Sequence, residues 1–259
     1  RFIKSMLELA DHYVSPSEFL AKRFVDWGMK AEKMSVIENG LDIDERAKDR
    51  QLSKTQPRRS RFAFFGQLTM FKGADILLDA VGRVPDEIWG DDARLMIFGG
   101  NLERQPPEYQ EKVHDLIEKA GDRVRFYGAY QNTEMPKLME LADWTIIPSI
   151  WWENSPVVIQ EAFFHGRPMI CSNIGGMAEK ITNGVNGLHF RVGSAEDLAD
   201  RLIDVLSDNK IWDRMREGIP RVTTYEECAE QHLAQYREVL KTRLLSAKAA
   251  TEQNVASTA

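Results

Sequence analysis

The sequence predicts an α/β protein built on a doubly wound, Rossmann-like parallel sheet of about six strands. Two observations indicate it: from residue 61 onward short apolar runs alternate with longer amphipathic stretches, and each run is strand-sized, mostly apolar on both faces and closed by Gly, Pro or Ser. Such runs are typical of parallel strands that helices cover on both sides. The runs are RFAFFG (61–66), RLMIFGG (94–100), RVRFYG (123–128), DWTIIPS (143–149), PMICS (168–172) and GLHF (187–190). Six β-α units in a row imply a doubly wound domain.

The stretches between the runs have the spacing of helices. Apolar residues recur at helical intervals from Ile76 to Val84 and from Leu198 to Leu206, which indicates helices with one buried face. Before the second stretch, Ser194 with Asp197 three residues later resembles a capping box. Further helices are predicted after residue 208.

The chain divides into five predicted parts. Residues 1–43 contain a strand, a helix and a second short run, an α/β fragment too small to bury a core of its own. The charged segment 44–60 is predicted to be a linker, and the sheet domain is expected over 61–225. A helix over 226–247 and a disordered tail over 248–259 complete the chain.

Composition narrows the classes of function. The chain has 259 residues, of which 43% are hydrophobic and 29% charged, as in ordinary soluble globular proteins. A formal net charge of −6 argues against a nucleic-acid-binding surface as the main activity. Cys171 and Cys228 lie in unrelated contexts, which favours free thiols in a reducing compartment over a disulfide. With no signal peptide and no apolar run long enough to cross a bilayer, we expect a cytoplasmic protein.

The segment GQLTMFKG follows the first run, at the strand end where open α/β sheets bind ligands. Gly66 lets the backbone pass close to a ligand, and Lys72 stands just before the next helix. The spacing does not fit a Walker loop. Because a helix N-terminus is already positive, a lysine there without an acidic neighbour is explained if a bound anion joins them. The alternative is a solvated lysine on a loop.

Two weaker features follow the second and third runs. Gly99 begins a glycine turn that gives a ligand access to the backbone, although a plain strand-to-helix turn is the better explanation. The third run ends in Phe126, Tyr127 and Gly128, whose backbone is suited to reading the edge of a base. Aromatic residues at a strand end are more often part of a core.

The segment ENSPVVIQE, after the fourth run, has a glutamate at each end. Ser155 is a good helix N-cap and Pro156 suits the first helical position, which predicts a helix from about Pro156 to His165. Glu153 then precedes the helix and Glu161 lies within it. Ionised carboxylates accept hydrogen bonds from vicinal hydroxyls, and free amides at a helix start bind phosphate. The alternatives are a helix-dipole partner for Glu153 and an exposed helix position for Glu161.

Together these residues resemble the C-terminal, donor-binding domain of a glycosyltransferase family 4 enzyme, one half of the two-domain GT-B architecture. The resemblance rests on GQLTMFKG, the turn at Tyr127, LADWTIIPS, ENSPVVIQEAFFHGRPMICSNIGGMAEKITNGVNG and the Glu-x7-Glu spacing from Glu153 to Glu161. ADHYVSPSEFLAKRF and VIENGLD resemble a remnant of the family's first, acceptor-side domain and its crossover. The match spans nearly all of 3–240.

The resemblance implies a hexosyltransferase-type enzyme of carbohydrate biosynthesis, which transfers a sugar from a nucleotide-diphospho-sugar such as a UDP- or GDP-sugar, with retention and with neither metal nor other cofactor. It implies that Glu161 holds the ribose hydroxyls and that the backbone near Tyr127 faces the base. It also implies catalytic roles for Glu153, at the donor sugar, and for Lys72, at the departing diphosphate. The donor-binding residues carried over by position are Gly66, Gln67, Lys72, Gly99, Tyr127, Glu153, Asn154, Ser155, Pro156, Val157 and Glu161.

The sequence departs from the family pattern in three places. Gln67 stands where the family commonly has Arg, a charged and bidentate ligand of diphosphate. Asn154-Ser155-Pro156 replaces a glycine-containing turn. Most of the first lobe is absent, so this chain is expected to bind donor weakly and to transfer poorly. The final helix is expected to leave an apolar face for the missing lobe or for a second copy of the chain.

Two other functions remain in view. A non-catalytic module that binds sugar nucleotides, or another interaction partner, would keep the fold and lose transfer. A dinucleotide-dependent oxidoreductase would need a Gly-x-Gly-x-x-Gly turn after the first strand, and the sequence has none. The sequence leaves the donor base, the sugar, the acceptor and any contact with a membrane open.

Overall fold

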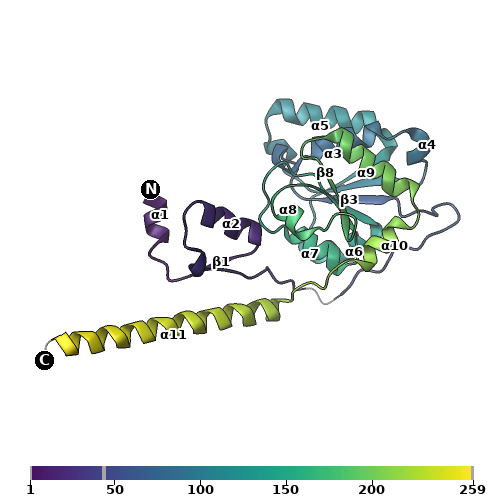
Figure 1. The fold of residues 1–259 in the computed structure, drawn as a ribbon. Helices are drawn as coiled ribbons and strands as arrows, with labels where there is room; N and C mark the ends of the chain where they lie inside the picture. Colours follow the sequence, from purple (N-terminus) through teal and green to yellow (C-terminus); the bar gives the residue numbers. More distant parts are fainter. Residues whose placement is uncertain (1, 43–44, 258–259) are drawn as a thin grey trace. The chain divides into compact units, whose positions relative to one another are not determined.

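The computed structural model describes residues 2–42 and 45–257. They form two compact units: one comprises residues 45–222, and the other joins 2–42 to 223–257. Figure 1 shows the chain coloured from one end to the other, with its helices and strands labelled. The two units are described separately.

The larger unit contains the predicted parallel sheet. All neighbouring strands are parallel, in the order β5-β4-β3-β6-β7-β8. The strands are β3 (Arg61–Phe65), β4 (Arg94–Phe98), β5 (Val124–Gly128), β6 (Trp144–Ile147), β7 (Met169–Ser172) and β8 (Gly187–Phe190). Each one falls inside one of the six predicted runs, so the predicted fold class is confirmed.

The strand order reverses between β3 and β6. From β3 the chain moves outward through β4 to β5, and it then returns to the other side of β3 to add β6, β7 and β8. In open α/β sheets a ligand binds beyond the carboxyl ends of the strands at such a switch point. The loops that leave β3 and β6 carry GQLTMFKG and ENSP, so the two strongest sequence motifs flank the switch point.

Helices cover both faces of this sheet, as Figure 1 shows. Phe62 and Phe64 of β3 pack in one apolar cluster, whereas Ala63 and Phe65 pack in the other. The first cluster includes α3 (Ala74–Arg83), α5 (Pro107–Ala120), α9 (Ala195–Ser207) and α10 (Ile211–Glu217). The second includes α6 (Met135–Leu141), α7 (Val157–Phe164) and α8 (Gly175–Lys180). The alternation of side chains along each strand therefore feeds two cores.

Short helical turns connect these elements: η2 (Met70–Lys72), α4 (Asp86–Trp89), η3 (Leu102–Arg104), η4 (Gly121–Arg123) and η5 (Asn132–Glu134). Ser194 is the N-cap of α9 and its hydroxyl accepts from the Asp197 N–H at 3.2 Å. The Asp197 carboxylate accepts instead from the Arg191 N–H (2.5 Å), so only half of the predicted capping box forms.

The run at 123–128 differs from its prediction because β5 is an edge strand. Phe126 is 48% exposed and Tyr127 is 45% exposed. A strand at the edge has a neighbour on one side only, so its side chains have less to pack against. These two aromatic side chains are therefore not core residues.

The segment predicted as a linker, 44–60, packs on the sheet unit over 45–60. The Arg50 guanidinium pairs with the Asp143 carboxylate at 2.6 Å, and Arg58 pairs with Asp92. The Ala47 N–H donates to Nδ1 of the buried His165 at 2.9 Å. Arg50 and Arg58 are charged residues of the predicted linker, and each pairs with a carboxylate that only the fold brings near.

The smaller unit holds the predicted first fragment and the C-terminal helix. Its elements are α1 (Phe2–Leu7), β1 (Tyr13–Ser15), α2 (Glu18–Asp26), η1 (Ala31–Lys33), β2 (Met34–Val36) and α11 (Tyr225–Ser257). Strands β1 and β2 pair in parallel. Ser17 caps α2 by accepting from the Leu20 N–H, as expected for a Ser-Pro-Ser segment before a helix.

Two predicted boundaries differ at the end of the chain. The compact sheet unit ends at residue 222 rather than 225. The helix predicted over 226–247 is longer, because α11 continues to Ser257; the segment 248–259, expected to be disordered, is helical as far as it is described. Its Ala, Glu and Gln residues favour helix, and neither Gly nor Pro ends it. No helix in the described parts of the chain combines the length and apolarity needed to cross a membrane.

Candidate functional site

An ion pair joins the loops on either side of the switch point. Lys72 Nζ lies 2.6 Å from Glu153 Oε1, and the Ser149 hydroxyl donates to the same oxygen at 2.8 Å. The premise that Lys72 has no acidic neighbour is therefore wrong, since its partner comes from 81 positions along the chain. The structure brings the two predicted catalytic residues together and adds Ser149, which the sequence reasoning missed although it closes the fourth run.

The backbone around this pair is held by neighbouring loops. The Ile150 N–H donates to the Phe71 carbonyl at 2.9 Å, and the Gly176 N–H donates to the Glu153 carbonyl at 2.6 Å. A Cβ at Gly176 would overlap the Asn154 carbonyl oxygen. The start of α8 therefore comes so close to Glu153 and Asn154 that position 176 needs glycine.

The start of α7 differs from its prediction by one residue. Pro156 is the N-cap, with an extended ψ of 117°, and the helix begins at Val157. Ser155 is not the cap: its hydroxyl is buried and has no hydrogen-bond partner in the part of the chain that the structure describes. Val157, a member of the predicted donor-binding set, is 44% exposed. The N-terminal turn of α7 thus presents backbone amides beside an unsatisfied hydroxyl.

Glu161 lies further along α7, next to Tyr130. Burial raises the pKa of the Glu161 carboxyl. Burial, together with the charge of Glu161, raises the pKa of Tyr130 to about 12. The ring of Tyr130 packs edge-on against Phe65, with centroids 5.7 Å apart, which places both residues near the carboxyl end of β3. Tyr130 was missed; its only signal was its place two residues after the third run.

The turns after β3 and β4 approach each other through glycines. The Gly66 N–H donates to the Phe98 carbonyl at 3.0 Å, and a Cβ at Gly99 would overlap the Gly66 carbonyl oxygen. The predicted close approach of the backbone therefore occurs between these two turns. The half-exposed ring of Tyr127 stacks on Phe98, with centroids 4.7 Å apart, and Gln67 is exposed.

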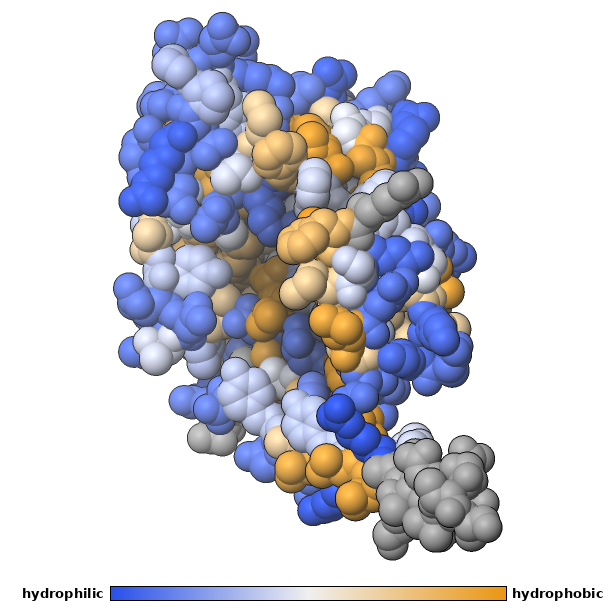
Figure 2. Space-filling view, turned by 90° about the vertical axis from the view of Figure 1, so that its left-hand side faces the viewer, coloured by the Kyte–Doolittle hydropathy of each residue, from blue (hydrophilic) through white to orange (hydrophobic). Residues whose placement is uncertain are grey.

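Large apolar side chains are exposed on the loops that follow β3 and β6, which also carry Lys72 and Glu153. Phe71 and Trp151 pack edge to face, with centroids 5.5 Å apart. Figure 2 shows apolar side chains gathered in patches on one face of an otherwise polar surface. The exposed apolar residues of the two loops are Met70, Phe71, Ile150, Trp151 and Trp152. The sequence analysis did not consider them as site residues.

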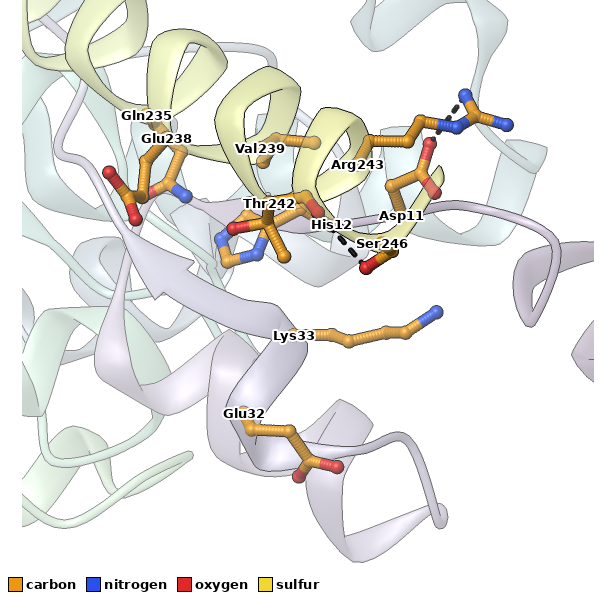
Figure 3. Close-up of a pocket in the computed structure, with 10 residues that line it drawn as sticks. All are labelled: Asp11, His12, Glu32, Lys33, Gln235, Glu238, Val239, Thr242, Arg243 and Ser246. Carbon is orange, nitrogen blue, oxygen red and sulfur yellow. Dashed lines mark hydrogen bonds and ion pairs between the residues drawn. The ribbon is translucent and has the colours of Figure 1, made fainter. Parts of the chain in front are cut away.

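A separate cavity of about 480 Å³ lies within the smaller unit, beside α11 (Figure 3). Arg243 of α11 pairs with Asp11 at 3.1 Å, and His12 lies within hydrogen-bond distance of Ser35 (3.0 Å). Its lining carries both signs of charge. The lining residues are Asp11, His12, Glu32, Lys33, Gln235, Glu238, Val239, Thr242, Arg243 and Ser246. None of them belongs to the predicted donor-binding set.

Among the described residues, no three His, Cys, Asp or Glu side chains gather as a set of metal ligands. Lys72, Glu153 and Ser149 form one group at the switch point, and Glu161 and Tyr130 form a second group further along α7. The first offers a cation and a carboxylate. The second offers a half-buried carboxylate that hydroxyl donors would stabilise.

Known proteins resemble this chain in sequence. The sequence model of the family described as glycosyl transferases group 1 matches residues 45–222. An uncharacterized 41.2 kDa protein in the cps region of Klebsiella pneumoniae is 27% identical over 216 residues, which cover 80% of this chain and 55% of that protein. A D-inositol 3-phosphate glycosyltransferase of Corynebacterium glutamicum (strain R) is 28% identical over 197 residues, which cover 72% of this chain and 46% of that protein. The chain thus spans about half the length of these relatives.

Solved structures share the fold. Anabaena Alr3699/HepE, in complex with UDP and glucose, matches with a TM-score of 0.73 at 23% identity, over 88% of this chain and 64% of that one. Because the family match takes in more than half of the chain, this protein belongs to the glycosyl transferases group 1 family.

Proposed function

We propose that the larger unit is the donor-binding part of a retaining glycosyltransferase, which binds a nucleotide-diphospho-sugar without a metal ion. One observation carries the proposal: Lys72 and Glu153 meet at the switch point, while Glu161 lies on α7, the helix that follows Glu153 in the chain. A nucleotide sugar presents a diol, a diphosphate and a sugar along one line. Glu161 matches the diol, Lys72 matches the diphosphate and Glu153 matches the sugar.

The diphosphate fits Lys72 and the start of α7. The Ile159 N–H donates to the Pro156 carbonyl at 3.0 Å, so the amides before it precede the helix's own hydrogen bonds. Helix N-termini favour anions, and the buried Ser155 hydroxyl, which has no partner among the described residues, would add one donor there. As the bond from the anomeric carbon to the phosphate oxygen breaks, its electron pair goes to the diphosphate, where Lys72 would stabilise the growing charge.

The ribose fits Glu161. A half-buried carboxylate is costly without hydrogen-bond donors, and its raised pKa expresses that cost. Two vicinal hydroxyls donate to the two oxygens of one carboxylate. Donor binding is therefore expected to stabilise the charged form of Glu161 and to lower its pKa.

The donor sugar fits Glu153. Its Oε1 accepts from Lys72 and Ser149, and its second oxygen would accept from sugar hydroxyls. In transfer with retention, the acceptor hydroxyl oxygen bonds to the anomeric carbon on the face that the diphosphate leaves, and the hydroxyl proton passes to the leaving phosphate. Glu153 would orient the sugar for this step.

The relatives support a nucleotide-sugar donor. The Corynebacterium glutamicum relative is described as a glycosyltransferase, and the Anabaena protein is described in complex with UDP and glucose. A second candidate is a non-catalytic module that binds sugar nucleotides. Gln67 favours it, because a neutral side chain there binds diphosphate less strongly than Arg would.

Titration calorimetry of the 259-residue chain with UDP, GDP and ADP tests the proposal. We expect one of them to bind, and Glu161→Ala to weaken that binding at least about tenfold. The exposed Glu103, which pairs loosely with Arg104 at 3.8 Å, gives the matched control Glu103→Ala, which is expected to bind like the wild type. If none of the three binds the wild type, the proposal is wrong. Binding without transfer of sugar from the matching nucleotide sugar to any saccharide or to water would favour the non-catalytic module.

A further inference from the structure

Tyr109, on α5, contacts the loop that carries Lys72 from inside the protein. Its hydroxyl lies 3.1 Å from the Thr69 carbonyl oxygen and 3.3 Å from Asp75 Oδ1. Tyr109 is 7% exposed and Asp75 is 8% exposed. The phenol is therefore a buried polar group whose partners come from the same loop and the helix that follows it.

The two partners stand on either side of Lys72. Thr69 precedes η2, the single turn that ends at Lys72, and Asp75 lies in the first turn of α3. The Thr69 carbonyl also accepts from the Lys72 N–H at 3.0 Å. One carbonyl oxygen thus connects Tyr109 to the backbone of Lys72.

Lys112 completes the arrangement. Its ammonium pairs with Asp75 Oδ2 at 2.6 Å, so Asp75 has one oxygen on Lys112 and the other near the phenol. Burial, followed by the charge of Asp75, raises the pKa of Tyr109, which keeps the phenol protonated at neutral pH. A protonated phenol has one hydrogen to donate, and Thr69 is the nearer acceptor.

We propose that Tyr109 is a positioning residue, which holds the Thr69–Lys72 turn so that the Lys72 ammonium meets Glu153 and the diphosphate. This inference rests on the proposed function for its consequence in binding. The positioning itself concerns contacts within the chain. The two can therefore be tested apart.

Hydrogen exchange of the chain without nucleotide tests the positioning. Tyr109→Phe keeps the ring, which belongs to the apolar core, and removes the hydroxyl. The Lys72 amide is expected to exchange about tenfold faster, because the turn opens more often. Tyr225→Phe, at an exposed position of the smaller unit, is the control and is expected to leave that exchange unchanged. Unchanged exchange in Tyr109→Phe would overturn the proposal.

A second variant tests the same contact without altering Tyr109. Lys112→Met leaves Asp75 without its ammonium and makes the carboxylate a stronger competitor for the phenol proton. We expect exchange of the Lys72 amide to rise about threefold. Slower or equal exchange would contradict the arrangement, whether or not Tyr109→Phe folds.

A double-mutant cycle tests the consequence for binding. The ligands are the nucleoside diphosphate that binds most tightly among UDP, GDP and ADP, and its monophosphate. Tyr109→Phe is expected to weaken binding of the diphosphate about tenfold and of the monophosphate less than about twofold, because only the diphosphate reaches Lys72. In the Lys72→Met background, Tyr109→Phe is expected to have no further effect. Equal weakening of both nucleotides, or full additivity with Lys72→Met, would assign Tyr109 a merely structural role. If none of UDP, GDP and ADP binds the wild type, the proposed function is wrong, and the exchange measurement still decides the positioning.

Discussion

The two glutamates near the start of α7 differ in what surrounds their carboxylates. Glu153, in the loop before the helix, accepts from the Lys72 ammonium and the Ser149 hydroxyl. Glu161, within the helix, lies where burial raises its pKa and where its charge raises the pKa of Tyr130. One carboxylate is compensated by the protein itself. The other is left in a place where donors from a ligand would stabilise it.

The two carboxylates mark two ends of the candidate site: a first end at Glu153 and Lys72, and a second end at Glu161. The difference in their surroundings predicts a different role for each end. A ligand at Glu153 must share or replace contacts that already exist, so binding there changes the geometry of an ion pair. A ligand at Glu161 adds hydrogen bonds to a costly charge. We therefore expect the first end to govern the transfer step and the affinity for the diphosphate, and the second to govern the affinity for the ribose.

The largest expected effect comes from removing the cation at the first end. Lys72→Met should lower the rate of sugar transfer on the order of 10²- to 10³-fold, since the departing diphosphate loses its charged donor. Steady-state kinetics with a nucleotide sugar measures it. Lys22→Met, which removes an exposed lysine paired with Asp26 in α2, is the control. Equal losses in both variants would show that the effect is not specific to this end of the site.

The next effect concerns His165, the C-cap of α7. Burial, then the charges of Arg167 and Arg46, lowers the pKa of His165 to about 4. The unfolded chain binds this proton below its ordinary value of 6.5, whereas the folded chain does so only near 4. Stability is therefore lost as pH falls from about 6.5 to about 4, by up to about 3 kcal/mol.

Urea unfolding across about pH 4 to 7 checks this dependence against His165→Asn. The Asn oxygen can still accept from the Ala47 N–H, and it does not titrate in this range. The variant is expected to lose less stability than the wild type between about pH 6.5 and 4. Parallel curves for the two proteins would rule out His165 as the cause.

A smaller effect should follow from crowding the backbone at the first end. In Gly176→Ala the new methyl would overlap the Asn154 carbonyl, and we expect a loss of about 2 kcal/mol in the free energy of unfolding, with weaker donor binding. Gly82, inside α3, has open space around it. Gly82→Ala is therefore the matched control, with an expected gain of about 0.5–1 kcal/mol. Thermal unfolding compares them; a loss of the same size in both would argue against a specific contact at Gly176.

The smallest expected effect concerns the charge of Glu161, at the second end of the site. Because the folded-state pKa of Glu161 is raised from 4.5, wild-type stability falls as pH rises through the folded value. Glu161→Gln removes that charge and should gain up to about 1 kcal/mol at about pH 7, while weakening donor binding. Urea unfolding at several pH values measures the gain, which should vanish below about pH 4, where the carboxyl is neutral in both states. A gain that persists at about pH 3 would have another origin.

Much of the fold was predictable because its strands are short, apolar and buried on both faces. The runs at 61–66 and 168–172 became β3 and β7 with nearly the predicted bounds. The edge strand β5 was harder, since its aromatics looked like core and are half-exposed. The tail was mistaken for disorder because its helix formers have no apolar pattern, and pattern was the main signal used.

The sequence singled out candidate site residues but did not predict the contacts between them. Glu153 and Glu161 stood out as carboxylates around an apolar run, and Lys72 stood out at a helix start. The ion pair between Lys72 and Glu153 depends on β6 lying beside β3, a strand order that no local pattern encodes. The same holds for Tyr109, whose partners lie at least 34 positions away. Ser155 was misplaced as a cap because Pro156 keeps an extended ψ and delays the helix by one residue.

The most direct test of the division between the two ends is a matrix of dissociation constants. Calorimetry would compare the tightest-binding nucleoside diphosphate among UDP, GDP and ADP with its monophosphate and with its 2′,3′-dideoxy form, in the wild type, Lys72→Met and Glu161→Gln. We predict that Lys72→Met abolishes only the preference for the diphosphate over the monophosphate. Glu161→Gln should abolish only the preference for the ribose hydroxyls. If both variants weaken all three ligands by the same factor, the two ends do not divide one nucleotide sugar between them.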